Sequence, residues 1–287
     1  MSKSFGNKYT IEKLDNGVIS FRHIQSGEIL HGSVGPEKEA RELYIVASGL
    51  SECHKSAVTI YDVGTGCAAQ LLALLDFLKE NSFIRNLKVF SFDLEKEGIA
   101  AVLAAQDTFP AAHRHRLFLQ KALESSQFQW KFENSSRLEW NFIEGDFRET
   151  LARMKDDNNE KADFIFYDFF SPASHPWLWT YELFTVLKAQ SNSDTCFVTY
   201  SSATCVKAAL LAAGWYVGTT IASGKKARSI FAATSMNHVS APLPAKFIST
   251  FRMSDKPFCD AETQKTKAII SEKLNEHLQF KSLPQVE

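Results

Sequence analysis

The sequence lacks several features that would assign it at once to a class of protein. No apolar run approaches the roughly 18 residues that a membrane-spanning helix requires. The first residues lack the apolar core of a signal peptide, so we expect no secretory leader. The five cysteines include no Cys-x-x-Cys pair, and an odd set of this kind indicates reduced thiols. Together these absences predict a cytoplasmic protein.

Charge of one sign and metal-ligand clusters are also scarce. The net charge is −1, so bulk charge does not mark the chain as a nucleic-acid-binding protein. His113-x-His115 would place its two rings on different sides of a helix, and we expect no metal site. Apolar residues, in contrast, make up 45% of the 287 residues and include 23 phenylalanines. That is enough for a large α/β domain with additions.

Short β-branched and aromatic runs alternate with runs of helical spacing along the middle of the chain. This alternation predicts an α/β fold of the Rossmann-like type, with a mostly parallel seven-stranded sheet that ends in an antiparallel β-hairpin. The strands are expected at residues 59–63, 89–94, 139–144, 162–168, 195–200, 215–221 and 228–234. Helices are expected between them, including a helical segment at 111–136 and a helix from 177 to 187.

Additions flank this sheet on both sides. Residues 9–22 predict a hairpin, and a following helix is expected to turn Tyr44 and Ile45 inward. At the other end, a helix that Asp260 caps is expected to run to residue 280. Its apolar face would be formed by Ile270, Leu274 and Leu278.

A glycine turn follows the first expected strand. Asp62-Val63-Gly64-Thr65-Gly66 precedes a run of helical spacing, and Ala69 completes the loose Gly-x-Gly-x-x-Ala fingerprint of dinucleotide sites. The glycines keep Cβ atoms out of the ligand's space and let the helix amides face it. The carboxylate of Asp62 would repel a pyrophosphate and attract a sulfonium or an ammonium, so we favour S-adenosylmethionine over NAD. A purely structural turn is the remaining alternative.

Carboxylates recur at the ends of the expected parallel strands. Asp62, Asp93, Asp146 and Asp168 each close such a strand. A single aspartate at this place is as readily a helix N-cap. Four at successive strand ends predict a ligand cleft, because sheets of this type bind ligands outside the carboxyl ends of their strands. Asp93 suits the two hydroxyls of a ribose.

Five stretches of the sequence carry a family resemblance. They are Gly27-Glu28 with His31-Gly32-Ser33, Gly35 and Glu39-Ala40; Gly64-Thr65-Gly66; Phe92-Asp93; Gly145-Asp146; and Tyr167-Asp168-Phe169-Phe170-Ser171-Pro172 with Pro176, Trp179 and Leu183-Phe184. On these motifs the sequence resembles class I S-adenosylmethionine-dependent methyltransferases over about residues 9–234. More narrowly, it is similar to the methyltransferase half of the bacterial bifunctional enzyme that completes 5-methylaminomethyl-2-thiouridine at the wobble position of tRNA.

The resemblance implies a site, a substrate and a division of the chain. Asp168 would be the catalytic residue beside the methyl group and the substrate amine. The implied cofactor-binding residues are Glu39, Asp62, Gly64, Thr65, Gly66, Asp93, Asp146 and Phe147. The implied substrate-binding residues, which stack on a uridine or contact tRNA, are Phe170, Pro172, Trp179, Ser201, Lys225 and Lys226. The expected parts are an N-terminal hairpin and helix at 1–50, the methyltransferase domain at 51–234 and a packed extension at 235–287.

Two features depart from the pattern of that family. Phe169 stands where the family usually has a small residue after the catalytic aspartate, which changes the expected pocket shape. The sequence also has no second glycine fingerprint, so we expect no FAD-dependent oxidase activity and a separate protein as its source. A methyltransferase acting on a small-molecule or protein amine, and a non-catalytic module that binds the cofactor or RNA, are the open alternatives.

Overall fold

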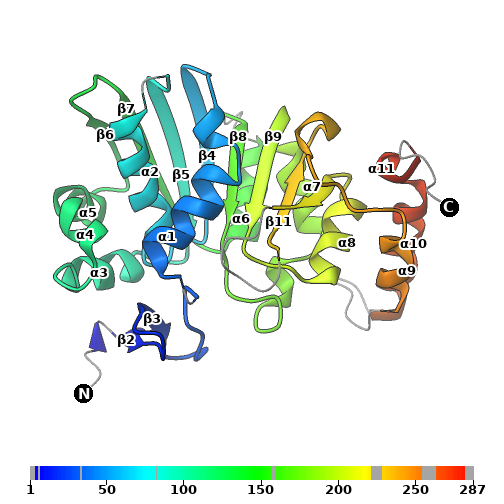
Figure 1. Ribbon diagram of the computed structural model, residues 1–287, viewed down its shortest axis with the longest axis horizontal. Helices are drawn as coiled ribbons and strands as arrows, with labels where there is room; N and C mark the ends of the chain where they lie inside the picture. The colour runs from blue at the N-terminus through cyan, green and yellow to red at the C-terminus, as the bar shows by residue number, and fades with distance from the viewer. Residues whose placement is uncertain are drawn as a thin grey trace.

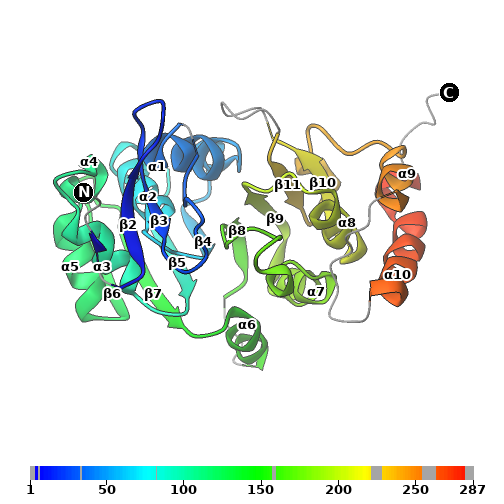
Figure 2. The same cartoon turned by 90° about the horizontal axis from the view of Figure 1, so that it is seen from below.

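The computed structural model describes residues 4–5, 7–32, 34–81, 83–156, 160–220, 228–253 and 263–281. Among these residues, eight strands form one sheet in the order β10-β11-β9-β8-β4-β5-β7-β6, with helices on both faces (Figures 1 and 2). The strands are β4 (Ala57–Val63), β5 (Asn86–Asp93), β6 (Gln127–Lys131), β7 (Arg137–Glu144), β8 (Ala162–Tyr167), β9 (Ser191–Thr199), β10 (Tyr216–Thr219) and β11 (Ile230–Ala233). The predicted α/β fold, with parallel strands in the middle and an antiparallel hairpin at one edge, is confirmed.

The strands are buried on both faces because each face carries its own apolar cluster. In β4, Ile60 packs on one side, whereas Tyr61 and Val63 pack on the other, as the period of two requires. The helices on the first side are α1 (Pro36–Ala40), the π-helical turn η1 (Arg41–Val46), α2 (Ala69–Glu80), α3 (Glu97–Ala104), α4 (Pro110–Arg114) and α5 (Arg116–Glu124). Those on the second side are α6 (Phe147–Asp156), α7 (Tyr181–Ala189) and α8 (Thr204–Ala212), with α9 (Phe247–Arg252), α10 (Thr263–Glu276) and α11 (Leu278–Lys281) beyond them.

The edge strand β6 corrects the expectation of a continuous helical segment at 111–136. Helix α5 ends at Glu124, and the next residues pair antiparallel with β7. Phe128 faces inward and contacts the rings of Phe118 and Trp140, with centroids 5.1 and 5.3 Å away. This pairing depends on a neighbouring strand, which the periodicity of the segment itself does not reveal.

Two other helices differ from their expected limits. The helix expected from residue 177 is interrupted, because Pro176–Leu178 form a 3-10 turn and α7 begins only after the N-cap Thr180. The helix expected to run to residue 280 breaks after Glu276. Ile270 and Leu274 are therefore buried as predicted, whereas Leu278 is 60% exposed. Asp260, the predicted cap, lies outside the described residues.

The N-terminal strands form a small separate sheet over the carboxyl ends of the central strands (Figure 2). It consists of β1 (Ser4–Phe5), β2 (Tyr9–Lys13) and β3 (Ile19–His23). The backbone N–H of Asn7 donates to the carboxylate of Glu97 at 2.8 Å, and Lys8 pairs with Glu95. These contacts fix the small sheet against the segment that follows β5, so that it roofs the strand ends.

The predicted inward packing of Tyr44 and Ile45 is confirmed, since each is 1% exposed. Among the helices that the structure describes, none is long and apolar enough to cross a membrane.

Candidate active site

A cavity of about 290 Å³ lies at the carboxyl ends of β4, β5 and β8, beneath the N-terminal sheet. Four carboxylates line it, those of Glu28, Glu39, Asp93 and Asp168. Among the described residues that line the cavity, none is a lysine or an arginine. A pocket of this charge attracts cations and disfavours phosphates.

The glycine turn forms one wall of the cavity, and its two glycines differ in what surrounds them. Gly64 has φ +82°, and a Cβ there would lie 2.7 Å from the carbonyl oxygen of Asp168. Gly64 leaves room for the segment that follows β8, where the Asp168 N–H donates to the Val63 carbonyl at 2.8 Å, and it also lines the cavity. Gly66 has φ +48° and meets nothing closer than 3.9 Å, so this position keeps the cavity open.

Asp62 lies beneath the turn and is fully buried. Its Oδ2 accepts hydrogen bonds from Ser91 Oγ at 2.8 Å and from Thr65 Oγ1 at 3.2 Å. Its Oδ1 has no hydrogen-bond partner among the described residues. Burial raises the pKa of Asp62 to about 6, against the smaller opposing effect of the two hydroxyls. The group thus supplies negative charge behind the turn without lining the cavity itself.

Asp93, at the end of β5, binds the turn directly. Its carboxylate accepts from the N–H of Gly66 and from that of Leu94, each at 2.7 Å. Burial raises its pKa to about 6, although both amide bonds favour the charged form. From the described residues each carboxylate oxygen accepts one hydrogen bond, and a carboxylate oxygen can accept a second, as a ribose hydroxyl would need.

Asp168, which follows β8, is held by a residue that the sequence did not point out. The Nε2 of Gln70, in the first turn of α2, donates to Asp168 Oδ2, and Gln70 is only 2% exposed. Tyr44 lies beneath them; burial, followed by the charges of Asp168 and Glu39, raises the pKa of its phenol well above the ordinary value. A signal was present in the sequence, because Gln70 is a polar residue on a helix face whose other buried residues are alanines, leucines and one phenylalanine.

The roof and the loop after β8 meet at Glu28. Its Oε2 accepts from the Ser171 N–H at 3.0 Å, and its Oε1 accepts from the Ser171 hydroxyl at 2.9 Å and from Ser174. Burial opposes the charged form of Glu28, but these bonds outweigh it and lower its pKa. Glu39 is bound more locally, by the Gly32 N–H at 2.9 Å. Glu28 is part of the motif noted in the sequence, but its hydrogen bonds to Ser171 and Ser174 were not predicted.

Not all predicted site residues are brought to the cavity. Asp146 and Phe147 do not line it: the first pairs with Arg148 at 2.6 Å, which lowers its pKa, and the second packs between Phe92 and Phe169. Pro172 and Ser201 also lie away from the lining. Lys225 and Lys226 lie outside the described residues.

Trp179 corrects a prediction about the substrate. It is completely buried, and its Nε1 donates to the Phe170 carbonyl at 3.1 Å. No face of the ring is available to a base, so Trp179 supports the loop that carries Phe170. Of the predicted substrate residues, Phe170 is the one that lines the cavity.

The residues present fit a cationic cofactor. The cavity wall combines four carboxylates with an open glycine turn at Gly66, and behind that turn Asp62 holds a buried oxygen with no partner among the described residues. A sulfonium and an ammonium would be favoured in these surroundings, whereas the pyrophosphate of a dinucleotide would be repelled. Among the described residues, no group of three or more histidine, cysteine, aspartate or glutamate side chains is placed to hold a metal ion.

Comparison with known proteins gives a consistent result. Residues 110–235 match the family of S-adenosyl-L-methionine-dependent methyltransferases. The crystal structure of MnmC2 from Aquifex aeolicus is similar to the chain with a TM-score of 0.68 and 24% identity, covering 93% of this chain and 84% of that one. Spermidine synthase from Thermotoga maritima has the same fold, with a TM-score of 0.52 and 13% identity over 96% of this chain and 87% of that one.

These matches confirm the resemblance predicted from the sequence motifs. The prediction of S-adenosylmethionine over NAD is confirmed as well, because the matching family depends on that cofactor. The chain thus combines a Rossmann-like sheet and an acidic cavity at the strand ends with a match of residues 110–235 to the S-adenosyl-L-methionine-dependent methyltransferases.

Proposed function

We propose that the enzyme methylates a primary amine, that of 5-aminomethyl-2-thiouridine at the wobble position of tRNA. The choice of an amine as the substrate group depends on the cavity, which is lined by four carboxylates and, among the described lining residues, by no lysine or arginine. An alkylamine is a cation at neutral pH, and such a cavity attracts it. The nucleoside and the tRNA are supported by the sequence motifs around Asp168 and by the fold shared with MnmC2.

S-adenosylmethionine, when bound, supplies an electrophilic methyl group on a sulfonium. The residues of the chain that would hold it are the turn at Gly66 and the carboxylate of Asp93, with the buried charge of Asp62 behind the turn. Asp168 receives the acceptor: its carboxylate binds the ammonium and takes the proton that must leave before the nitrogen becomes nucleophilic. Gln70 holds Oδ2 of this carboxylate, so that Oδ1 faces a fixed direction.

No covalent nucleophile is required for this reaction. Holding the nitrogen in line with the methyl group makes an effective molarity of about 10⁵ M available. Gly64 contributes to this alignment, because the close approach of β4 and β8 that it permits sets the position of Asp168.

A second candidate is methylation of a small polyamine. The acidic cavity would accept such a cation equally well, and spermidine synthase has the same fold. The two candidates differ in what must lie outside the cavity: a tRNA loop needs a surface on the rim, whereas a polyamine does not.

A methyl-transfer assay distinguishes these functions. Radiolabelled S-adenosylmethionine is supplied with tRNA from cells that lack the wobble methyl group, with fully modified tRNA, or with putrescine. We expect label only in the undermethylated tRNA, and in its wobble nucleoside after digestion. Transfer to putrescine alone would replace tRNA by a polyamine as substrate, and binding of tRNA without transfer would make the protein a binding module. Asp168→Asn serves as the inactive control.

A further inference from the structure

A row of aromatic rings leads from the cavity to the surface. His23 and Phe170 have centroids 4.7 Å apart, Phe170 and His175 are stacked at 5.0 Å, and His175 and Trp177 are 5.0 Å apart. The row begins at the cavity, which Phe170 lines, and ends at Trp177, which is 43% exposed. It comes from two parts of the chain, the small N-terminal sheet and the loop after β8.

The loop that carries three of these rings is held firmly. Glu28 accepts three hydrogen bonds from Ser171 and Ser174, as described above, and the Tyr200 hydroxyl donates to the Phe169 carbonyl at 2.9 Å. The His175 ring nitrogen Nδ1 lies 2.9 Å from Ser174 Oγ. These bonds tie the loop to the N-terminal sheet and to Tyr200, while the Trp177 indole stays 43% exposed against His175.

We propose that Trp177 and His175 form a stacking platform for the nucleobase next to the methyl acceptor in a single-stranded RNA loop. This inference depends on the proposed tRNA substrate. Bases of RNA loops are unstacked and are recognised on aromatic faces, which every base can use. The platform is continuous with the cavity, because the ring of Phe170 lines the cavity and stacks on that of His175.

The platform explains how an acidic cavity can serve an anionic substrate. Phosphates are repelled by the four carboxylates, so binding energy for the RNA must come from groups outside the cavity. Stacking supplies it without a positive charge, and it orients the neighbouring nucleotide so that the acceptor enters beside Asp168.

Trp177→Ala is expected to raise the Kd for an anticodon stem-loop about tenfold, since stacking of one base is lost. Trp177→Phe should keep most of the affinity, because the ring remains. Affinity for S-adenosylmethionine should be unchanged in both. The matched control is Phe83→Ala: Phe83 is 53% exposed and also contacts a histidine, His54, at 4.5 Å, but it lies far from the cavity, before β5.

A double-mutant cycle identifies the base. An abasic nucleotide is placed on one side of the acceptor and then on the other, and each stem-loop is titrated against wild type and Trp177→Ala. At one of the two positions, the loss of affinity caused by the abasic nucleotide and the loss caused by Trp177→Ala should not be additive, because both changes remove the same stacking contact. Additive losses at both positions, or an unchanged Kd for Trp177→Ala, would overturn the platform.

Fluorescence provides an independent readout. Of the five tryptophans, Trp140, Trp179 and Trp215 are fully buried and Trp130 is half-buried, so RNA that stacks on Trp177 should quench the exposed component of the emission. The quenching should disappear in Trp177→Phe. If the stem-loop quenches Trp177 but no methyl group is transferred, the platform stands and the proposed function fails. If tRNA is methylated and Trp177→Ala binds it with unaltered affinity, the proposed function stands and the platform fails.

Discussion

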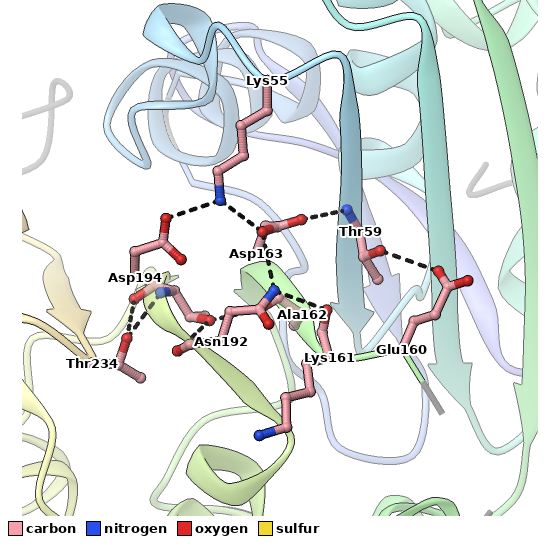
Figure 3. Close-up of polar contacts among 10 residues, drawn as sticks. Lys55, Thr59, Glu160, Lys161, Ala162, Asp163, Asn192, Asp194 and Thr234 are labelled. Atoms are coloured by element: carbon pink, nitrogen blue, oxygen red, sulfur yellow. Dashed lines mark hydrogen bonds and ion pairs between the residues drawn. The ribbon is translucent and has the colours of Figure 1, made fainter. Parts of the chain in front are cut away.

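The two ends of the central sheet use carboxylates in opposite ways. At the amino ends of β4, β8 and β9, Lys55 Nζ lies 2.9 Å from both Asp163 Oδ1 and Asp194 Oδ2 (Figure 3). Asp163 also accepts from the Thr59 N–H at 2.9 Å. Here each carboxylate has a cation or an amide within reach, and the bond from Lys55 lowers the pKa of Asp194.

At the carboxyl ends the carboxylates converge on a cavity that, among the described residues, no lysine or arginine lines. Burial raises the pKa values of Asp62 and Asp93 to about 6. At the amino ends, in contrast, the ion pair with Lys55 lowers the pKa of Asp194. The paired carboxylates stabilise the fold, and these two buried ones cost folding free energy that a cationic ligand can recover. The difference separates a structural end of the sheet from a functional one.

The largest effect is expected from changing the charge at Asp168. Asp168→Asn should lower kcat by about 10² to 10⁴, because an amide neither holds the ammonium nor takes its proton. The fold should persist, since the Gln70 amide can still donate to the remaining oxygen. Single-turnover methyl transfer with saturating cofactor provides the measurement, and calorimetry with S-adenosylmethionine provides the control. Near wild-type turnover would reduce Asp168 to a structural group.

The two glycines of the turn should separate stability from binding. Gly64→Ala places a Cβ against the Asp168 carbonyl at 2.7 Å in a left-handed conformation, so we expect it to cost about 3 kcal/mol or more of unfolding free energy. In Gly66→Ala the added Cβ would have no neighbour closer than 3.9 Å, so this variant should lose only about 1 kcal/mol of unfolding free energy. It should nevertheless bind the cofactor more weakly, because the Cβ faces the cavity. Urea unfolding and calorimetry test the pair. Equal stability losses would mean that both glycines serve the backbone alone.

Asp62 should give the unliganded protein an unusual pH dependence. Its pKa is about 6 in the fold and lies near 4 in an unfolded chain, so the folded protein binds the proton more tightly. Its contribution to stability is therefore lost as the pH rises from about 4 to 6, by roughly 3 kcal/mol. Urea unfolding across this range should show a flatter profile for Asp62→Asn than for wild type.

The cofactor should reverse this dependence. A cation bound near Asp62 favours the ionised form, so affinity for S-adenosylmethionine should increase between pH 5 and 7 and then level off. Calorimetry in two buffers of different ionisation enthalpy would detect the proton released at pH 6. The Asp62→Asn variant should release no proton. If the wild type releases none either, the positive charge of the cofactor lies away from Asp62.

The sequence predicted features that depend on local order, and it failed where distant segments meet. The strands that end in Asp62, Asp93 and Asp168 follow from alternation and turn residues, which are local. The strand β6 requires β7 as a neighbour, and the contact of Glu28 with Ser171 spans 143 residues. Periodicity carries no information on either.

Aromatic residues show the same limit within one loop. Phe170, Trp177 and Trp179 lie within ten positions of one another, yet the first lines the cavity, the second is 43% exposed and the third is buried. A loop has no fixed period, so nothing in the spacing says which ring faces solvent. The prediction placed Trp179 among the stacking rings, but its ring is completely buried, whereas that of Trp177 reaches the surface.

The smallest effect is expected at the structural end of the sheet. Lys55→Met removes the cation between Asp163 and Asp194, whose side chains are 12% and 41% exposed, and should cost about 1 kcal/mol of unfolding free energy. The loss should shrink in high salt, because these partly exposed charges are screened. Its pH dependence should be opposite to that of Asp62: the bond from Lys55 lowers the pKa of Asp194, so the stabilisation is present above pH 4 and is lost as the pH falls through the folded-state pKa. Asp194→Asn combined with Lys55→Met should be less destabilising than the sum of the two, since both remove one interaction. Cofactor affinity should be unaltered in all three variants; a loss of affinity would mean that the two ends of the sheet are coupled.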